Sequence, residues 1–457
     1  MAFDPKDTKK DDGYQDRYHR SCLKTGVAFI GVLSYPFAQS KISRSPAIFP
    51  ETLSVKTRFL VAFLILSFSV RAQQQSEAQL REKADRLAHE YIITDGHVDI
   101  PYRLHDRWED ISKRTEKGDF DYVRAKVGGL DAPFMSIYVP SERENNGAKA
   151  LADTLIDMVY RFEKDWPDKF AVATSVDAVR SQFRKGLISL PMGMENGAPI
   201  EGKIENVKYF YDRGIRYITL THGKDNHISD SSYDTTHTWK GLSEFGKNVV
   251  AEMNRVGIMV DVSHITDDAF HQVIQLSKAP VIASHSSCRY FTPGFERNMS
   301  DDMIKLLAAK GGVINIAFGP GFVNGEYQRK ENVAFDEIRA YLKKNNLQFT
   351  DPKAQAYIEE YQKTHDIKKV GISEVADHID HVVHLAGVDC VGFGSDFDGV
   401  GPILPVGLED VSKYPNLVYE LLKRGYSDAD IKKICGENML RVWARVEQVA
   451  KEMQARQ

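Results

Sequence analysis

Residues 241–264 read GLSEFGKNVVAEMNRVGIMVDVSH, and this stretch contains a complete helix-to-strand unit. Residues 243–256 carry the apolar spacing of a helix, and residues 258–264 form a short β-rich run that ends in His264. A helix that leads directly into a buried strand is typical of folds built on a parallel sheet. The stretch therefore predicts one repeating unit of an α/β protein, with a histidine at the carboxyl end of its strand.

The same kind of unit recurs on both sides of this stretch. Further β-rich runs are YIITDGH (91–97), FMSIYVP (134–140), LISLPMGME (187–195), YITLTH (217–222), PVIASHS (280–286), GVINIAF (312–318) and CVGFGSD (390–396). Helix-like segments lie over 75–90, 146–165, 202–213, 266–277, 300–309, 372–386 and 427–448. Strands and helices that alternate in this way favour parallel βαβ units, and eight of them close into a (β/α)8 TIM barrel. A doubly wound open sheet is the alternative.

The polar residues at the strand ends favour the barrel. Imidazole or carboxylate side chains end six of the runs, namely His97, Glu195, His222, His264, His285 and Asp396. In an open sheet such residues would be spread along a line. In a closed barrel they converge on one mouth, where barrel enzymes hold their active sites. We therefore expect an α/β TIM barrel of the metal-dependent hydrolase type.

The first of these strand ends contains a His-x-Asp pair, His97 and Asp99, within Asp95-Gly96-His97-Val98-Asp99. Side chains two residues apart in a strand point the same way, so His97 and Asp99 can bind one divalent metal. The pair is weak support by itself, because a satisfied polar strand end would look the same.

Three further strand-end residues complete a ligand set. His264 and His285 end consecutive strands, whose ends lie about 5 Å apart, so the two imidazoles can share a metal. Glu195 ends a buried strand and needs a cationic partner there; the alternative to a metal is a buried salt bridge with an arginine. Counting ligands gives one site from His97 and Asp99, a second from His264 and His285, and Glu195 as the bridge. Three protein ligands and an open position are typical of catalytic zinc, so we predict two Zn²⁺ per subunit.

These motifs resemble those of a known family. DGHVD, MENG, LTH, GIMVDVSH, PVIASHSS, ERN and GFGSDFDG, in this order, are similar to the membrane dipeptidase (renal dipeptidase) family, peptidase family M19, over about residues 91–448. The resemblance implies a (β/α)8 barrel with a bridged two-zinc centre, commonly dimeric, that hydrolyses dipeptides with a two-metal-bound hydroxide. It assigns the zinc ligands to the set already counted: His97, Asp99, Glu195, His264 and His285. The family also accepts D-residues at the C-terminal position, and some members open β-lactams.

The resemblance carries over three more roles. His222 matches the histidine that contacts the substrate carbonyl and the developing oxyanion. Arg297 matches the arginine that binds the substrate carboxylate, and a surface loop arginine is the alternative reading. Asp396 matches the aspartate that shuttles a proton. We interpret Asp398 as a residue that structures the loop beside Gly399.

Two segments depart from the mammalian pattern, and both bear on substrate choice. Residues 223–239 form a long polar segment after His222. Residues 325–371 form a charged, helix-like insertion between the seventh and eighth strands. We interpret the insertion as a lid or dimer element at the barrel mouth; a solvated surface excursion is the alternative.

Two other classes of protein remain as alternatives. One is another binuclear metal amidohydrolase, acting on a β-lactam, a lactone or an N-acyl amino acid. Such relatives often bridge their metals with a modified lysine, whereas Glu195 stands at the bridging position here. The other is a non-catalytic periplasmic binding protein, which would have no use for the proton shuttle Asp396.

The N-terminal region reads as a targeting segment. Residues 59–70 are an apolar run of twelve, with Lys56 and Arg58 before it and Ala72 after it. Twelve residues are too few to span a bilayer, so we predict a signal peptide at 55–72, with a buried apolar helix as the alternative. Residues 1–54 are expected to be a non-native or disordered extension, with Val55 as the true start. Residues 73–457 then form a single dipeptidase domain, periplasmic or secreted, with no stable membrane anchor after cleavage.

The composition of the chain limits the classes of molecule that it is expected to bind. The chain of 457 residues is 42% hydrophobic and 27% charged, with a net charge of −4. This balance provides no basic surface for nucleic acid. The cysteines after residue 72 are Cys288, Cys390 and Cys435, an odd and sparse set that predicts no disulfide framework. The expected partners are dipeptide substrates and a second copy of the chain in a homodimer.

Overall fold

The computed structural model describes residues 76–347, 351–365, 369–401 and 403–456. These residues belong to one compact unit, Ser67–Gln457. The predicted extension 1–54 and signal peptide 55–72 lie outside the described residues. Among the helices that are described, none combines the length and the apolar character needed to cross a bilayer.

Eight parallel strands of the described chain close into a barrel, in the order β1-β10-β9-β8-β7-β6-β5-β2. Their bounds are β1 (Ile93–Val98), β2 (Leu130–Tyr138), β5 (Met192–Glu195), β6 (Ile215–Thr219), β7 (Met259–Asp261), β8 (Ile282–Ser286), β9 (Val313–Ile316) and β10 (Val391–Phe393). The ring closes where Asp95 of β1 pairs with Phe393 of β10. The predicted barrel is therefore confirmed, and the open doubly wound sheet is excluded.

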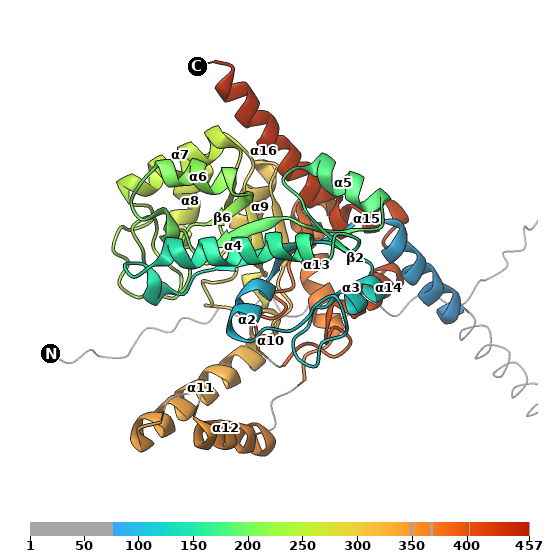
Figure 1. Cartoon of the computed structure of the whole chain (residues 1–457). Helices are drawn as coiled ribbons and strands as arrows, with labels where there is room; N and C mark the ends of the chain where they lie inside the picture. The colour runs from blue at the N-terminus through green and yellow to red at the C-terminus, as the bar shows by residue number, and fades with distance from the viewer. Residues whose placement is uncertain (1–75, 348–350, 366–368, 402, 457) are drawn as a thin grey trace, which may run out of the picture. The chain divides into compact units, whose positions relative to one another are not determined.

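Helices surround the barrel and connect its strands (Figure 1). Residues 76–90 are helical. The named helices around the barrel are α2 (Ile100–Asp106), α3 (Tyr122–Gly128), α4 (Ala148–Asp165), α5 (Val176–Arg184), α6 (Glu205–Asp212), α7 (Glu244–Val256), α8 (Asp267–Leu276), α9 (Asp301–Ala309), α13 (Ile372–Ala386), α14 (Tyr414–Lys423), α15 (Asp428–Lys432) and α16 (Asn438–Gln454). Ser243, Thr266 and Ser300 cap α7, α8 and α9 by accepting a backbone N–H of the first turn. Each such cap contributes about 1 kcal/mol, so the sequence fixes where these helices begin.

Side chains inside the barrel follow the period of two that strands impose. On β2, Phe134 packs with Tyr217 and with Trp443 of α16, in an apolar cluster at one end of the barrel interior. Two residues further along, Ser136 lies beside Glu195, and Tyr138 then reaches the cavity. The barrel is thus filled with apolar side chains at one end and carries its polar groups at the carboxyl ends of the strands.

The predicted strand 187–195 is wrong as a single element. Pro191 divides it into β4 (Ile188–Leu190) and β5, and β4 pairs outside the barrel with β3 (Phe170–Val172). The Pro191 nitrogen carries no hydrogen to donate to a ladder, whereas its carbonyl accepts from Met135 N at 2.8 Å. The predicted helix 427–448 is likewise interrupted, by a π-helical segment Lys433–Glu437 between α15 and α16.

The described residues of the insertion between β9 and β10 are mostly helical. The short α10 (Pro320–Val323) leads into α11 (Gly325–Asn345), which is followed by α12 (Pro352–Thr364) (Figure 1). Asn324 caps α11 by accepting from the backbone N–H groups of Glu326 and Tyr327. Ala334, Ile338 and Leu342 of α11 pack on Ala354, Ile358 and Tyr361 of α12 in a cluster of their own. We call α11 and α12 the insertion hairpin.

Candidate metal centre and substrate cavity

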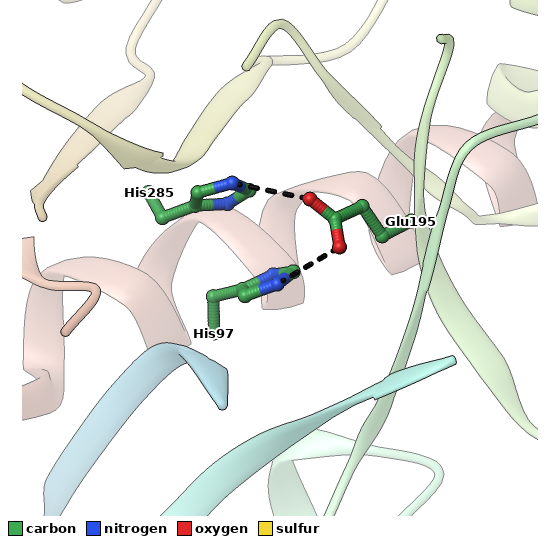
Figure 2. A group of neighbouring side chains, drawn as sticks. All are labelled: His97, Glu195 and His285. Carbon is green, nitrogen blue, oxygen red and sulfur yellow. Dashed lines mark ion pairs between the residues drawn. The ribbon is translucent and has the colours of Figure 1, made fainter. Parts of the chain in front are cut away.

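Glu195 is the point on which the predicted ligands converge. It is the last residue of β5 and is 3% exposed. His97 Nε2 lies 3.3 Å from Glu195 Oε2, while His285 Nε2 lies 3.3 Å and His264 Nε2 3.1 Å from Glu195 Oε1. Figure 2 shows the imidazoles of His97 and His285 each facing a different oxygen of the carboxylate. The ion-pair partners of Glu195 among the described residues are histidines, so the alternative of a salt bridge with an arginine is wrong.

His97 and Asp99 lie together as their spacing predicts. His97 is the last residue but one of β1 and Asp99 is the N-cap residue of α2, and His97 Nε2 is 3.4 Å from Asp99 Oδ2. Both side chains are buried, and His97 Nε2 and Asp99 Oδ1 have no hydrogen-bond partner among the described residues. Burial alone would lower the pKa of His97, but Tyr217 and the carboxylates of Glu195 and Asp99 hold it well above its usual value. A cation that binds here would replace that proton.

His264 and His285 present two nitrogens to one point. Their Nε2 atoms are 2.9 Å apart. Burial holds the pKa of His264 well below its usual value and lowers that of His285 to about 3, so both rings are neutral. Ser284 Oγ lies 2.5 Å from Asp261 Oδ2, to which it donates, and 2.9 Å from His285 Nδ1, from which it accepts. This series of hydrogen bonds places the proton of His285 on Nδ1 and leaves the Nε2 lone pair for a metal.

The chain takes a constrained path through the site. His264 and Asp396 both have positive φ angles, 69° and 63°, which are uncommon for residues other than glycine. Gly399 leaves room for the carboxylates of Asp99 and Asp396: a Cβ there would lie 2.2 Å from Asp99 Oδ2 and 2.3 Å from Asp396 Oδ1. Strain of this kind is retained where surrounding contacts fix the backbone, and it is concentrated at functional sites.

The donor set fits a pair of metals. The ligand atoms fall into three overlapping groups, each with atoms within 4.8 Å of one another: His97, Glu195 and His285; Glu195, His222 and His264; and His97, Asp99 and Asp396. Glu195 belongs to two of these groups, which places it where a bridging carboxylate would lie. The partition into one metal on His97 and Asp99 and another on His264 and His285 stays a prediction.

His222 and Asp396, predicted for roles other than metal binding, also lie in these groups. His222 Nε2 is 3.6 Å from Glu195 Oε1, and its ring packs edge-on against Tyr138. Burial lowers the pKa of His222. Burial raises the pKa of Asp396 well above its usual value, reinforced by the nearby carboxylates of Asp99 and Glu195. Asp396 is therefore a buried carboxyl group beside other carboxylates, where a bound cation would favour its charged form.

Arg297 is buried, at 3% exposed, so the alternative of a surface arginine is wrong. Its Nη2 donates to the carbonyl of His285 at 2.8 Å, while Nε and Nη1 are buried with no hydrogen-bond partner in the described chain. Its guanidinium lies 5.3 Å from the centre of the Phe322 ring. Free donors on a buried guanidinium are suited to a carboxylate.

Asp398 structures its loop as we interpreted. It accepts from Arg103 Nε at 2.9 Å and from the backbone of Asp119 at 2.6 Å, while its own N–H donates to Asp119.

The cysteines after residue 72 are free and buried, in agreement with the absence of a predicted disulfide framework.

Some residues of the site were missed at the sequence level. Tyr217 OH lies 2.7 Å from His97 Nδ1, Ser136 Oγ donates to Glu195 Oε2 at 3.4 Å, and Tyr138 lines the cavity. Ser136 and Tyr138 could have been found, because they alternate with apolar residues in FMSIYVP and face the same side as each other. Tyr217 gives no such signal, because an inward aromatic residue also fits a barrel core.

A cavity of about 810 Å³ opens over these ligands. Barrel residues such as Asp99, Glu195, His222 and Asp396 line one part of it, and Glu331, Phe335 and Arg339 of α11 line another. The insertion therefore lies at the barrel mouth, as predicted. Tyr233, from the polar segment 223–239, also lines the cavity, with its ring 5.8 Å from that of His264.

Comparison with known proteins agrees with this geometry. The family model for the membrane dipeptidases, peptidase family M19, matches residues 81–457. The chain belongs to the membrane dipeptidase family. It is thus a metallopeptidase-family hydrolase that acts on peptide bonds, with a candidate binuclear metal centre of histidines and acidic residues. The family resemblance of the sequence motifs is confirmed.

Solved structures of two bacterial proteins are similar over most of their length. The probable dipeptidase PvdM from Pseudomonas aeruginosa is 26% identical, with a TM-score of 0.71, covering 82% of this chain and 100% of that one. A metallo peptidase from Rhodobacter sphaeroides, liganded with a phosphinate mimic of the dipeptide L-Ala-D-Ala, is 25% identical, with a TM-score of 0.65. That match covers 78% of this chain and 99% of the other.

Proposed function

We propose that this membrane dipeptidase family member is a zinc-dependent dipeptidase that also accepts a D-residue at the C-terminal position. The observation that carries the proposal is the convergence of three imidazoles on Glu195, beside an Arg297 guanidinium with free buried donors. Imidazole and carboxylate ligands suit Zn²⁺. The D-residue is supported by the Rhodobacter sphaeroides relative, which is liganded with a mimic of L-Ala-D-Ala.

Arg297 would anchor the substrate. Its Nε and Nη1, which are buried and have no hydrogen-bond partner among the described residues, would pair with the carboxylate of the C-terminal residue, and this pairing would restrict the site to short peptides. The ring of Phe322 lies 5.3 Å from the guanidinium, which is buried. A buried cation that lacks a counter-ion gains more from a carboxylate than an exposed one does, because water screens the interaction less.

The proton steps would belong to His222 and Asp396. The metal pair, when bound, supplies Lewis acidity and a water of lowered pKa. His222 is the most exposed histidine of the site and is neutral there, so it can donate a hydrogen bond to the developing oxyanion. Asp396 lies within the ligand group of His97 and Asp99 and can take the proton of the attacking water and deliver it to the departing amine.

The cellular setting belongs to the same proposal. The predicted signal peptide at 55–72 supports a periplasmic or secreted enzyme, and the family resemblance supports a homodimer. Sequencing the N-terminus of the mature protein tests whether the signal peptide is cleaved. Size-exclusion chromatography with light scattering of the protein from residue 73 measures its oligomeric state.

Hydrolysis of a panel of L-L and L-D dipeptides tests the function. We expect the protein from residue 73 to release free amino acids when zinc is supplied, and to lose this activity when zinc is removed with a chelator. Glu195→Gln is the matched control, because it keeps the volume of the side chain and removes the charge that both ligand groups share. A protein that binds zinc but hydrolyses no dipeptide would contradict the proposal.

A further inference from the structure

Glu331 is a carboxylate on the cavity wall that the proposed chemistry does not use. It lies on the face of α11 that lines the cavity, opposite the barrel ligands. Among the described residues it has no hydrogen bond and no ion pair, and burial raises its pKa to about 7. A partly buried acid without a partner costs stability in its charged form, so its position calls for a cation that arrives from outside the chain.

The backbone beside Glu331 is shaped to leave this carboxylate in the cavity. A Cβ on Gly321 would lie 2.3 Å from Glu331 Oε2. Any other residue at 321 would therefore displace the carboxylate. Gly321 precedes Phe322, whose ring lies 5.3 Å from the Arg297 guanidinium, so the segment that contacts the Glu331 carboxylate also contacts Arg297.

Three aromatic side chains form a wall of the cavity near Glu331 and Arg297. The rings of Phe322 and Phe295 stack at 6.0 Å, and those of Phe295 and Tyr233 lie 6.1 Å apart. All three residues line the cavity. A substrate carboxylate on Arg297 places the side chain of the C-terminal residue against this wall, with Glu331 further along it. An apolar stem that ends in a cation fits such a surface, because the stem packs on aromatic rings and the charged end meets the carboxylate.

We propose that Glu331 is a specificity residue that binds a basic side chain, an ammonium or guanidinium, on the C-terminal residue of the dipeptide. This inference rests on the proposed function, in which Arg297 holds the C-terminal carboxylate. Apart from Glu331, the charged side chains that α11 places on the cavity are those of Asp336 and Arg339, and both are exposed. Glu331 is thus the partly buried acid of this wall.

The test measures kcat/KM for Ala-Ala, Ala-Met, Ala-Lys and Lys-Ala, each with the C-terminal residue in L and D form. Wild type is expected to prefer Ala-Lys over Ala-Met by roughly tenfold to a hundredfold, the range for a charge-assisted hydrogen bond away from bulk water. Glu331→Gln should abolish this preference. Gly321→Ala should reduce it, because it displaces the carboxylate without removing it. Asp336→Asn removes the same charge from the same helix and should retain the preference.

Each other outcome overturns the inference in a distinct way. Hydrolysis of Ala-Ala with no preference for Ala-Lys contradicts the specificity and leaves the dipeptidase standing. An equal loss on all substrates in Glu331→Gln means that Glu331 is structural. A preference for Lys-Ala that Glu331→Gln removes would place the cation on the N-terminal residue. An equal loss of the preference in Asp336→Asn would mean that the net charge of α11, and not Glu331 itself, attracts the substrate cation. Failure of wild type to hydrolyse any of the four dipeptides removes the proposed function and this inference with it.

Discussion

The barrel mouth and the insertion hairpin enclose the same cavity, yet they are built in different ways. At the mouth, His97, Glu195 and His285 come from strands of the barrel itself and are almost completely buried. The hairpin instead has its own small apolar cluster, and Tyr327 at the start of α11 joins it to the main core. Figure 1 shows α11 and α12 side by side, apart from the helices that surround the barrel.

The difference separates two tasks. Metal ligands must be held to within a fraction of an ångström, and strands of a closed barrel provide that rigidity. Substrate selection tolerates more motion and can be carried by an added element that packs on itself. We therefore assign the chemistry to the barrel and the selection of the substrate side chain to the insertion hairpin. Each prediction below affects one region and is expected to spare the other.

The largest effect is expected at Asp396. Asp396→Asn keeps the shape of the side chain but removes the group that exchanges a proton, so kcat should fall by roughly 10²–10⁴-fold on every dipeptide. Steady-state kinetics on Ala-Ala, with metal content measured in parallel, checks this. A variant that keeps its metal and retains activity within a few-fold of wild type would remove Asp396 from the mechanism.

A smaller effect, on zinc affinity, is expected at Tyr217, which contacts the predicted ligand His97. Tyr217→Phe removes the hydroxyl that lies 2.7 Å from His97 Nδ1, and loss of a hydrogen bond of this type weakens metal binding by roughly tenfold to a hundredfold. Competition with a chromophoric chelator measures the zinc affinity. Tyr138→Phe is the control: it removes a hydroxyl from another ring at the mouth and should leave the affinity unchanged. Equal affinities for Tyr217→Phe and wild type would sink the idea that Tyr217 orients His97.

The smallest effect on activity is expected in the insertion hairpin. Ile338→Ala should loosen α11 from α12 at a cost of about 2 kcal/mol, low in the range for such changes because the cluster is small. Hydrogen exchange over 325–345 should rise while hydrolysis of Ala-Ala and the thermal midpoint change little. Ile314→Ala in β9 creates a cavity in the main core and should lower the thermal midpoint of the whole unit. Equal falls in the midpoint for both variants would show that hairpin and barrel unfold together.

The ligands at the strand ends could be predicted from sequence because barrel geometry brings them together whatever the loops do. His97, Glu195, His264 and His285 needed only the order of strands and the rule that parallel strands share one carboxyl end. Arg297 was found through the family motif, since a loop arginine gives no physical signal of burial.

Other features depend on packing that no local pattern contains. Pro191 interrupts a run whose apolar character continues on both sides, and the sheet that β4 joins lies outside the barrel. Tyr217 is an aromatic residue inside a strand, where core packing and support of a ligand look alike. Glu331 lies in a charged helical segment, and the sequence pattern does not show that this residue lines the cavity.

The measurement that tests the account most directly is a zinc titration of the metal-free protein, followed by its turnover of Ala-Ala. If two metals share Glu195, activity should rise until two equivalents of zinc are bound per chain and then level off. Full activity at one equivalent, or activity that survives complete removal of metal, would contradict a two-metal centre built on His97, Asp99, Glu195, His264 and His285.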